Sequence, residues 1–127
     1  GFKSQPEKII SGGPMMGFAM FGLDIPTTKT SSSILCFTKD EVTQFEPLAC
    51  INCGRCVEAC PEQLIPSRLA KFATNGLMSE FEKWHGLECI ECGSCTFACP
   101  SRRQVAQPIK TMKKLTLAEK RKQASKK

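Results

Sequence analysis

Hydrophobic residues recur at helical spacing in the second half of the chain. Apolar positions three and four apart predict two short amphipathic helices, one from Ser67 to Gly76 and one that ends at Gly86. Ser101 is expected to begin a further helix. Pro108 kinks that helix or starts a second one, because proline lacks the amide hydrogen that a helix interior needs.

The first part of the chain shows no such period and is typical of short strands and turns. The run from Ser32 to Phe37 is the best strand candidate. The glycines between residues 12 and 22 fail the spacing of a dinucleotide-binding fingerprint, so we expect a structural turn rather than a phosphate-binding loop. Cys36 is expected to be a buried apolar residue of the strand. The residues expected to fill a core beside it are Met15, Met16, Phe18, Met20 and Phe21.

Charge and hydropathy exclude several functions. The net charge is +6, and the basic excess lies in residues 110–127. Nucleic-acid binding requires a basic face with aromatic or helical elements that contact the bases, and a lysine-rich end alone does not provide one. The lysines are more consistent with a solvated tail or with a contact to an acidic protein or anionic lipid. No apolar run is long enough to cross a bilayer, so membrane attachment is expected to come through partners.

All but one of the nine cysteines fall in two copies of one motif. Each copy reads C-x-x-C-x-x-C-x-x-x-C-P, and isoleucine, glycine, alanine and proline recur in register between them. This is the spacing of ferredoxin-type [4Fe–4S] sites, so its presence twice predicts two clusters. The cysteines of the two copies are Cys50, Cys53, Cys56 and Cys60, and Cys89, Cys92, Cys95 and Cys99.

The spacing also predicts which cysteines act together. Gly54 and Gly93 allow the tight loop that three thiolates around one centre require. A proline after the fourth cysteine turns that residue away from its own triplet. In two-cluster ferredoxins the fourth cysteine ligates the other cluster. We therefore assign two ligand sets, Cys50, Cys53, Cys56 and Cys99 for cluster 1, and Cys89, Cys92, Cys95 and Cys60 for cluster 2.

Two other uses of these cysteines are less consistent with the pattern. A disulfide framework is disfavoured because the cysteines form tight triplets and no signal peptide precedes them. Zinc sites pair C-x-x-C units and have no use for a triplet that ends in cysteine-proline, although two structural zinc sites would use the same eight residues. No catalytic residues stand out, and the segment itself is interpreted as an electron carrier.

The residues near the motifs suggest how each cluster is tuned. Ile51, Val57, Leu64, Ile90 and Phe97 are expected to shield the clusters from water. Arg55 has no basic counterpart in the second copy, where Ser94 stands, so Arg55 would raise the potential of cluster 1 if it lies close to it.

The long connection between the motifs favours an all-helical ferredoxin domain over the compact βαββαβ type. We expect a mostly α fold, with a two-cluster α-helical ferredoxin domain over 46–118. A short β- and turn-rich segment over 1–45 precedes it, and a basic flexible tail over 119–127 follows. Because the chain opens at Gly1 in a turn-rich stretch, we interpret it as a piece of a longer polypeptide whose upstream domain ends in 1–45.

Over roughly residues 8–118 the chain resembles the C-terminal part of the C subunit of the Rnf complex, an ion-translocating ferredoxin:NAD+ oxidoreductase. The resemblance rests on Ile10-Ser11-Gly12-Gly13-Pro14-Met15-Met16-Gly17, on Pro26-Thr27-Thr28-Lys29-Thr30, and on both cysteine motifs in order. The glycine-proline-methionine stretch is its most specific part, since ferredoxin motifs occur in many families.

The resemblance implies a peripheral subunit on the cytoplasmic face of the bacterial inner membrane. Such a subunit passes electrons between a flavin and NAD(H) site and other redox subunits, and it meets ferredoxin indirectly. FMN and NAD(H) would bind only in the upstream domain, so no ligand for them is assigned here. The translocase activity would belong to the parent complex.

Two alternatives stay open at this point. A soluble or microcompartment flavin or cobalamin reductase shares this layout of motifs. A structural-metal interaction module would use the same cysteines without redox chemistry.

Overall fold

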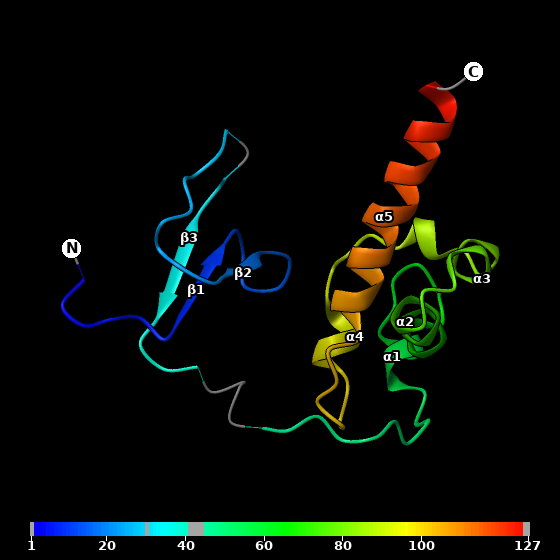
Figure 1. The fold of residues 1–127 in the computed structure, drawn as a ribbon. Helices are drawn as coiled ribbons and strands as arrows, with labels where there is room; N and C mark the ends of the chain where they lie inside the picture. The colour runs from blue at the N-terminus through cyan, green and yellow to red at the C-terminus, as the bar shows by residue number, and fades with distance from the viewer. Residues whose placement is uncertain (1, 30, 41–44, 126–127) are drawn as a thin grey trace. The chain divides into compact units, whose positions relative to one another are not determined.

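The computed structural model describes residues 2–29, 31–40 and 45–125 and divides the chain into two compact units, Gly1–Glu46 and Pro47–Lys127. Within the described residues, the first unit has three strands and the second has helices (Figure 1). Each unit is described separately below.

The first unit is a small antiparallel sheet of β1 (Lys8–Ser11), β2 (Phe18–Met20) and β3 (Ile34–Phe37), in the order β2-β1-β3. The strand predicted over 32–37 is therefore confirmed as β3. In the central strand Ile9 pairs with Met20 on one side and with Cys36 on the other. Ile9 and Ile10 are buried, so the apolar pair identified in the sequence is the centre of this sheet.

A glycine turn joins β1 to β2. Gly12 has a φ of 103°, which favours glycine, and the amide of Gly17 donates a hydrogen bond to the carbonyl of Gly13 at 2.8 Å. A Cβ atom on Gly17 would lie 2.5 Å from that same carbonyl oxygen, too close for any side chain. The glycines thus serve a close backbone return, as a structural turn requires.

Two expectations about this unit are wrong. Cys36 is exposed rather than buried. The aromatic and methionine side chains do not form a core either, since Phe21 is 97% exposed and Met15, Met16 and Phe18 are about half exposed. The physical reason is that three short strands make one layer, and among the described residues of this unit no second layer covers them.

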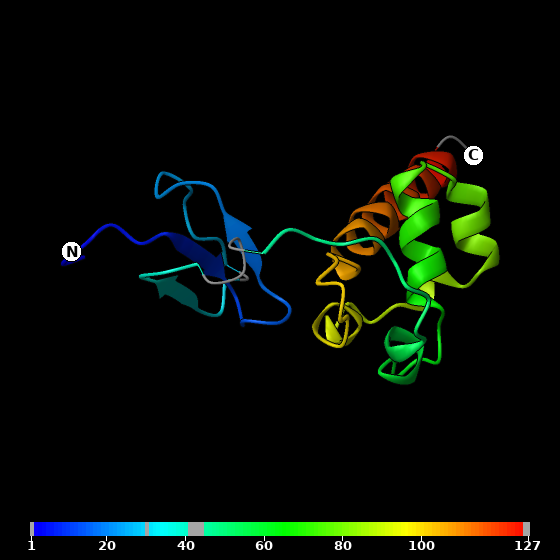
Figure 2. The ribbon, with the colours of Figure 1, turned by 90° about the horizontal axis from the view of Figure 1, so that it is seen from below.

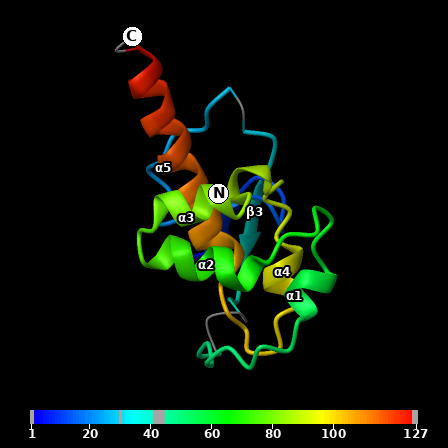
Figure 3. The same cartoon turned by 90° about the vertical axis from the view of Figure 1, so that its right-hand side faces the viewer.

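The second unit contains the helices α1 (Arg55–Glu58), α2 (Pro66–Thr74), α3 (Met78–Lys83), α4 (Ser94–Phe97) and α5 (Ala106–Ser125), and the 3-10 helix η1 (Gly86–Glu88). Helices α2 and α3 pack against α5 (Figure 3). Phe81, Leu69 and Ile109 form the centre of this packing, each with at most 1% of its surface exposed. Burying each of them stabilises the unit by about 1.5–3 kcal/mol.

The two predicted amphipathic helices are confirmed as α2 and α3, with a corrected start. Helix α2 begins at Pro66 after Ile65, so Ser67 is not its N-cap. Proline suits the first helical position because its missing amide hydrogen has no partner there anyway. Gly86 follows α3, and a Cβ atom on it would lie 2.5 Å from the Phe81 ring. This glycine therefore permits close packing, but the prediction that it ends the second helix is wrong, because α3 ends at Lys83 and Gly86 begins η1.

The helix predicted from Ser101 is wrong. Arg102 has a φ of 51°, a left-handed conformation that breaks any helix there. Helix α5 instead begins at Ala106, whose amide donates a hydrogen bond to Oγ1 of Thr96 at 2.8 Å, and Pro108 lies in its first turn. Pro108 therefore lies near the start of a helix, as the second alternative expected, but the helix begins two residues before it.

The last helix also runs further than expected. Residues 119–125 continue α5, and their side chains are exposed. The Nζ of Lys120 lies 2.8 Å from a carboxylate oxygen of Glu82, which ties α5 to α3. The flexibility of this stretch stays a prediction.

Candidate metal centres

The two cysteine motifs fold into the same local structure. Gly54 precedes α1 with a φ of 81°, and Gly93 precedes α4 with a φ of 83°. The third cysteine of each motif, Cys56 or Cys95, lies within the short helix that follows. Helices α1 and α4 lie side by side (Figures 2 and 3). The glycines therefore provide the tight loop that the spacing predicts.

Other left-handed residues repeat with the motifs. Asn52 and Glu91 occupy equivalent positions, with φ angles of 53° and 61°. Gln63 and Arg102 form a second equivalent pair, with φ angles of 52° and 51°. Positive φ is uncommon outside glycine and costs roughly 1–2 kcal/mol per residue. Its recurrence in both copies shows that the backbone path of the motif, as well as its spacing, is duplicated.

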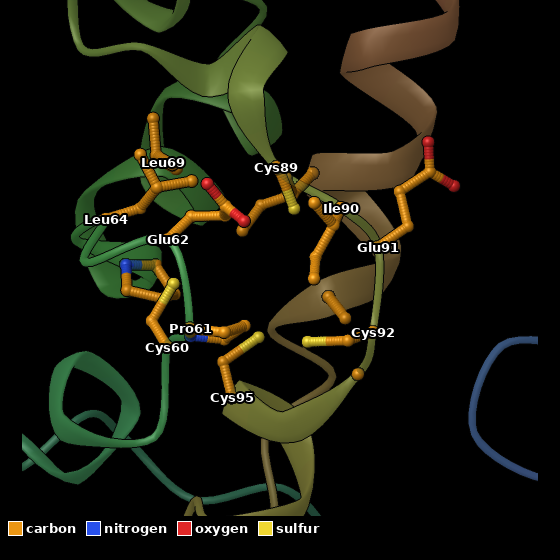
Figure 4. Close-up of a pocket in the computed structure, with 14 residues that line it drawn as sticks. Cys60, Pro61, Glu62, Leu64, Leu69, Cys89, Ile90, Glu91, Cys92 and Cys95 are labelled. Atoms are coloured by element: carbon orange, nitrogen blue, oxygen red, sulfur yellow. The ribbon is translucent and has the colours of Figure 1, made fainter.

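One pocket, called here the second pocket, is surrounded by three cysteines of the second motif and one of the first. Figure 4 shows the sulfur atoms of Cys89, Cys92 and Cys95 directed toward a common space, with Cys60 entering from the opposite side. Leu64, Leu69 and Ile109 form part of its wall and link it to the core.

The other pocket, called here the first pocket, has the complementary set of cysteines. Its walls contain Cys50, Cys53 and Cys56 of the first motif and Cys99 of the second. Val57, Val105 and Arg103 also line it. In both pockets the fourth cysteine therefore comes from the other motif.

The two pockets differ in burial. Cys50 and Cys53 of the first pocket are exposed, whereas Cys95 of the second is buried. The expected shielding residues do not follow this division. At the second pocket Leu64 is buried but Ile90 is 48% exposed, and at the first pocket Ile51 is 66% exposed while Val57 is partly buried. Phe97 lines neither pocket and is 89% exposed, so its predicted shielding role is wrong within this unit.

Burial also changes the chemistry of the thiols. It raises the pKa of the Cys89 thiol, and it raises the pKa of the Cys95 thiol to about 11. The Ser94 hydroxyl, 3.4 Å from the sulfur of Cys92, forms a hydrogen bond that lowers the pKa of that thiol. Metal binding requires thiolates, so filling the second pocket must release protons.

The charged residues beside the pockets differ from those expected. Arg55 is exposed and is not part of the wall of the first pocket, where Arg103 lies instead. At the second pocket the Nζ of Lys113 donates a hydrogen bond to the carbonyl oxygen of Cys89 at 2.6 Å. Sequence reasoning missed both Arg103 and Lys113. No local sequence pattern indicated the contact of Lys113 with Cys89, because it depends on how α5 packs.

The donor set of each pocket fits an iron–sulfur cluster. Four cysteines are the usual ligands of a [4Fe–4S] cluster, and each iron atom takes a different one. Among the described residues, no three His, Cys, Asp or Glu side chains lie close enough to share a single metal ion. Each pocket thus provides the four cysteines that a [4Fe–4S] cluster uses as ligands.

Comparison with known proteins supports this chemistry. Residues 49–105, which contain both motifs, match the family described as a 4Fe-4S dicluster domain. The chain is 45% identical, over 122 residues and 96% of its length, to the C subunit of the Na(+)-translocating ferredoxin:NAD(+) oxidoreductase complex of Acetobacterium woodii. It is 54% identical over 80 residues, 63% of its length, to the proton-translocating counterpart of Clostridium ljungdahlii.

The chain is homologous to these C subunits. The resemblance predicted from the sequence is confirmed, and it extends to the C subunit of the ion-translocating oxidoreductase complex of Vibrio cholerae, at 42% identity over 86 residues and 65% of the chain. These matches cover 28%, 18% and 11% of the Acetobacterium, Clostridium and Vibrio proteins, respectively. The homology therefore concerns a minor part of each of these relatives. No helix among the described residues is long and apolar enough to cross a membrane.

Proposed function

We propose that residues 47–118 form a mostly α-helical ferredoxin domain that holds two [4Fe–4S] clusters, one in each pocket. The domain would carry electrons within an ion-translocating ferredoxin:NAD+ oxidoreductase complex. When bound, a [4Fe–4S] cluster accepts and releases single electrons. The chain's own residues provide ligands, hold them in place and limit the access of water.

A single observation carries the proposal. The spacing of the cysteines predicts two ligand sets with an exchanged fourth member, and the walls of the two pockets contain those same two sets. The sequence pattern and the walls of the pockets both favour Cys60 and Cys99 as the exchanged ligands.

The surroundings of the pockets suit electron transfer better than structural metal binding. Leu64, Leu69 and Ile109 exclude water from the second pocket, and a low local dielectric together with hydrogen bonds near sulfur sets the potential of a cluster. Helices α1 and α4 carry one motif each and lie side by side. The two clusters would then be close enough to exchange electrons.

The relatives' names suggest the setting. We place the chain in a C subunit at the cytoplasmic face of the bacterial inner membrane, attached through other subunits of the complex. It would connect a flavin and NAD(H) site in an upstream domain with the other redox subunits. The homology to three complex subunits favours this setting over a soluble or microcompartment reductase. Co-purification with membrane subunits would separate these two settings.

The ligand sets can be tested by counting iron in paired variants after anaerobic reconstitution. The unchanged chain should contain about eight iron and eight sulfide atoms, and Cys53→Ala should retain about half. If Cys99 serves the same cluster as Cys53, the double variant Cys53→Ala with Cys99→Ala should keep the same half. The double variant Cys53→Ala with Cys60→Ala should then lose nearly all iron.

The control for this experiment is Cys36→Ala, which lies in the other unit and should leave the iron content unchanged. The reverse result for the two double variants would refute the exchanged ligands. Zinc without sulfide, and no visible absorbance that bleaches on reduction, would refute iron–sulfur chemistry altogether.

A further inference from the structure

A lysine of α5 contacts the backbone of a predicted cluster ligand. The Nζ of Lys113 donates a hydrogen bond to the carbonyl oxygen of Cys89 at 2.6 Å and lies 3.9 Å from a carboxylate oxygen of Glu91. The side chains of Lys113 and Glu91 are only 20% and 25% exposed. The ammonium group therefore fastens the start of the second motif to α5.

The side chains of the two residues that Lys113 contacts, Cys89 and Glu91, point in different directions. In Figure 4 the sulfur of Cys89 is directed into the second pocket, while the carboxylate of Glu91 is directed away from it. The negative charge of Glu91 thus lies on the far side of the loop. The positive charge of Lys113 lies beside the backbone of a residue that points into the pocket.

The equivalent position of the first motif is built differently. Cys50 corresponds to Cys89, but it is exposed, and its sulfur lies 3.6 Å from Oδ1 of the neutral Asn52. Asn52 stands where Glu91 stands in the second motif, and both residues have left-handed backbones. The second motif therefore has the charged pair of Lys113 and Glu91 at a place where the first motif has the neutral Asn52.

We propose that Lys113 is a positioning residue of the second pocket, which holds Cys89 in place and makes the cluster bound there easier to reduce without affecting the first pocket. The inference rests on the proposed function, since it concerns a cluster held by Cys89. Reduction adds one electron and so one negative charge. A partly buried ammonium group beside a ligand stabilises that charge more than the same group would in water.

The test compares Lys113→Met with Lys113→Arg in the reconstituted protein, using a potentiometric titration with dithionite followed by electron paramagnetic resonance. Lys113→Met should make reduction of one cluster about tenfold less favourable, a fall of about 59 mV for a one-electron couple. Lys113→Arg keeps the charge and should restore most of the original value. Lys114→Met, on the exposed side of the same helix, is the matched control and should shift neither cluster.

The affected cluster can be identified with cysteine variants. The shift caused by Lys113→Met should persist in a Cys53→Ala background, where only the second pocket is complete, and should be absent in a Cys92→Ala background. Unchanged potentials, or equal shifts of both clusters, would overturn the inference. If the proposed function itself is wrong, the result is distinguishable, because the unchanged chain would then contain no iron or sulfide after reconstitution.

A second measurement needs no metal. In the metal-free chain, loss of the Lys113 contact should speed amide hydrogen exchange in residues 86–92 and leave exchange in residues 50–56 unchanged. Circular dichroism shows whether the variant is folded. If Lys113→Met, Lys113→Arg and the unchanged chain exchanged amide hydrogens in residues 86–92 at equal rates, the positioning role would also be overturned.

Discussion

The two pockets are built from one duplicated motif, but they are covered to different degrees. The second pocket rests on the helical core, with Leu69 and Ile109 in its wall and a buried Cys95. The first pocket is lined by Val57 and Val105 and has two exposed cysteines. The comparison shows that the motif fixes the loop and the positions of the cysteines, while the packing of α2 and α5 against the second pocket buries that pocket more deeply.

The largest expected effect concerns the stability of the metal-free chain. Leu69→Ala should lower the free energy of unfolding by about 2–5 kcal/mol, because Leu69 is 1% exposed and its loss leaves a cavity. Val57→Ala at the partly buried wall of the first pocket should cost no more than about 1 kcal/mol. Urea unfolding under anaerobic conditions measures both. Equal losses would show that the two walls are equally packed.

A smaller effect is expected when metal is removed. A chelator should take iron from the first pocket about tenfold faster than from the second, equivalent to about 1.4 kcal/mol in activation free energy, because Cys50 and Cys53 are open to solvent. Loss of visible absorbance should therefore have two phases. The fast phase should be absent in Cys53→Ala. A single phase in the unchanged chain would contradict the difference in cover.

The smallest effect concerns charge at the first pocket. Arg103→Gln should lower the potential of the first cluster by up to about 59 mV, because a guanidinium in the pocket wall stabilises the reduced, more negative state. The exposed Arg55, outside the wall, should give a smaller shift when changed to Ser. Redox titration measures both variants. A larger shift for Arg55 than for Arg103 would refute this assignment.

Much of the site could be predicted because its determinants are local. The spacing of cysteine, glycine and proline within each motif dictates a short loop, a helical turn and a fourth cysteine directed elsewhere, and the structure has each of these features. The helices α2 and α3 were also predictable, since their apolar residues repeat within one element. The connection between the motifs is helical in the structure, as its length suggested.

The features that the sequence did not predict depend on contacts between distant parts of the chain. Lys113 meets Cys89 through packing of α5 that no local pattern encodes. The start of α5 at Ala106 depends on a hydrogen bond to Thr96, and the left-handed Arg102 prevented the helix expected from Ser101. Hydrophobicity alone likewise misplaced Phe21 and Phe97, which are apolar but exposed within their units.

The exchange of the fourth cysteines has a consequence for synthesis on the ribosome. The triplet of Cys50, Cys53 and Cys56 emerges early, but the wall of its pocket is incomplete until Cys99 has been made. The second pocket also remains incomplete after Cys60 has been made, because its other three cysteines belong to the second triplet. Under the proposed function, the first motif therefore cannot hold a complete ligand set while the second is still being translated. A nascent chain that stops between the motifs would contain the four cysteines of the first motif and no complete pocket.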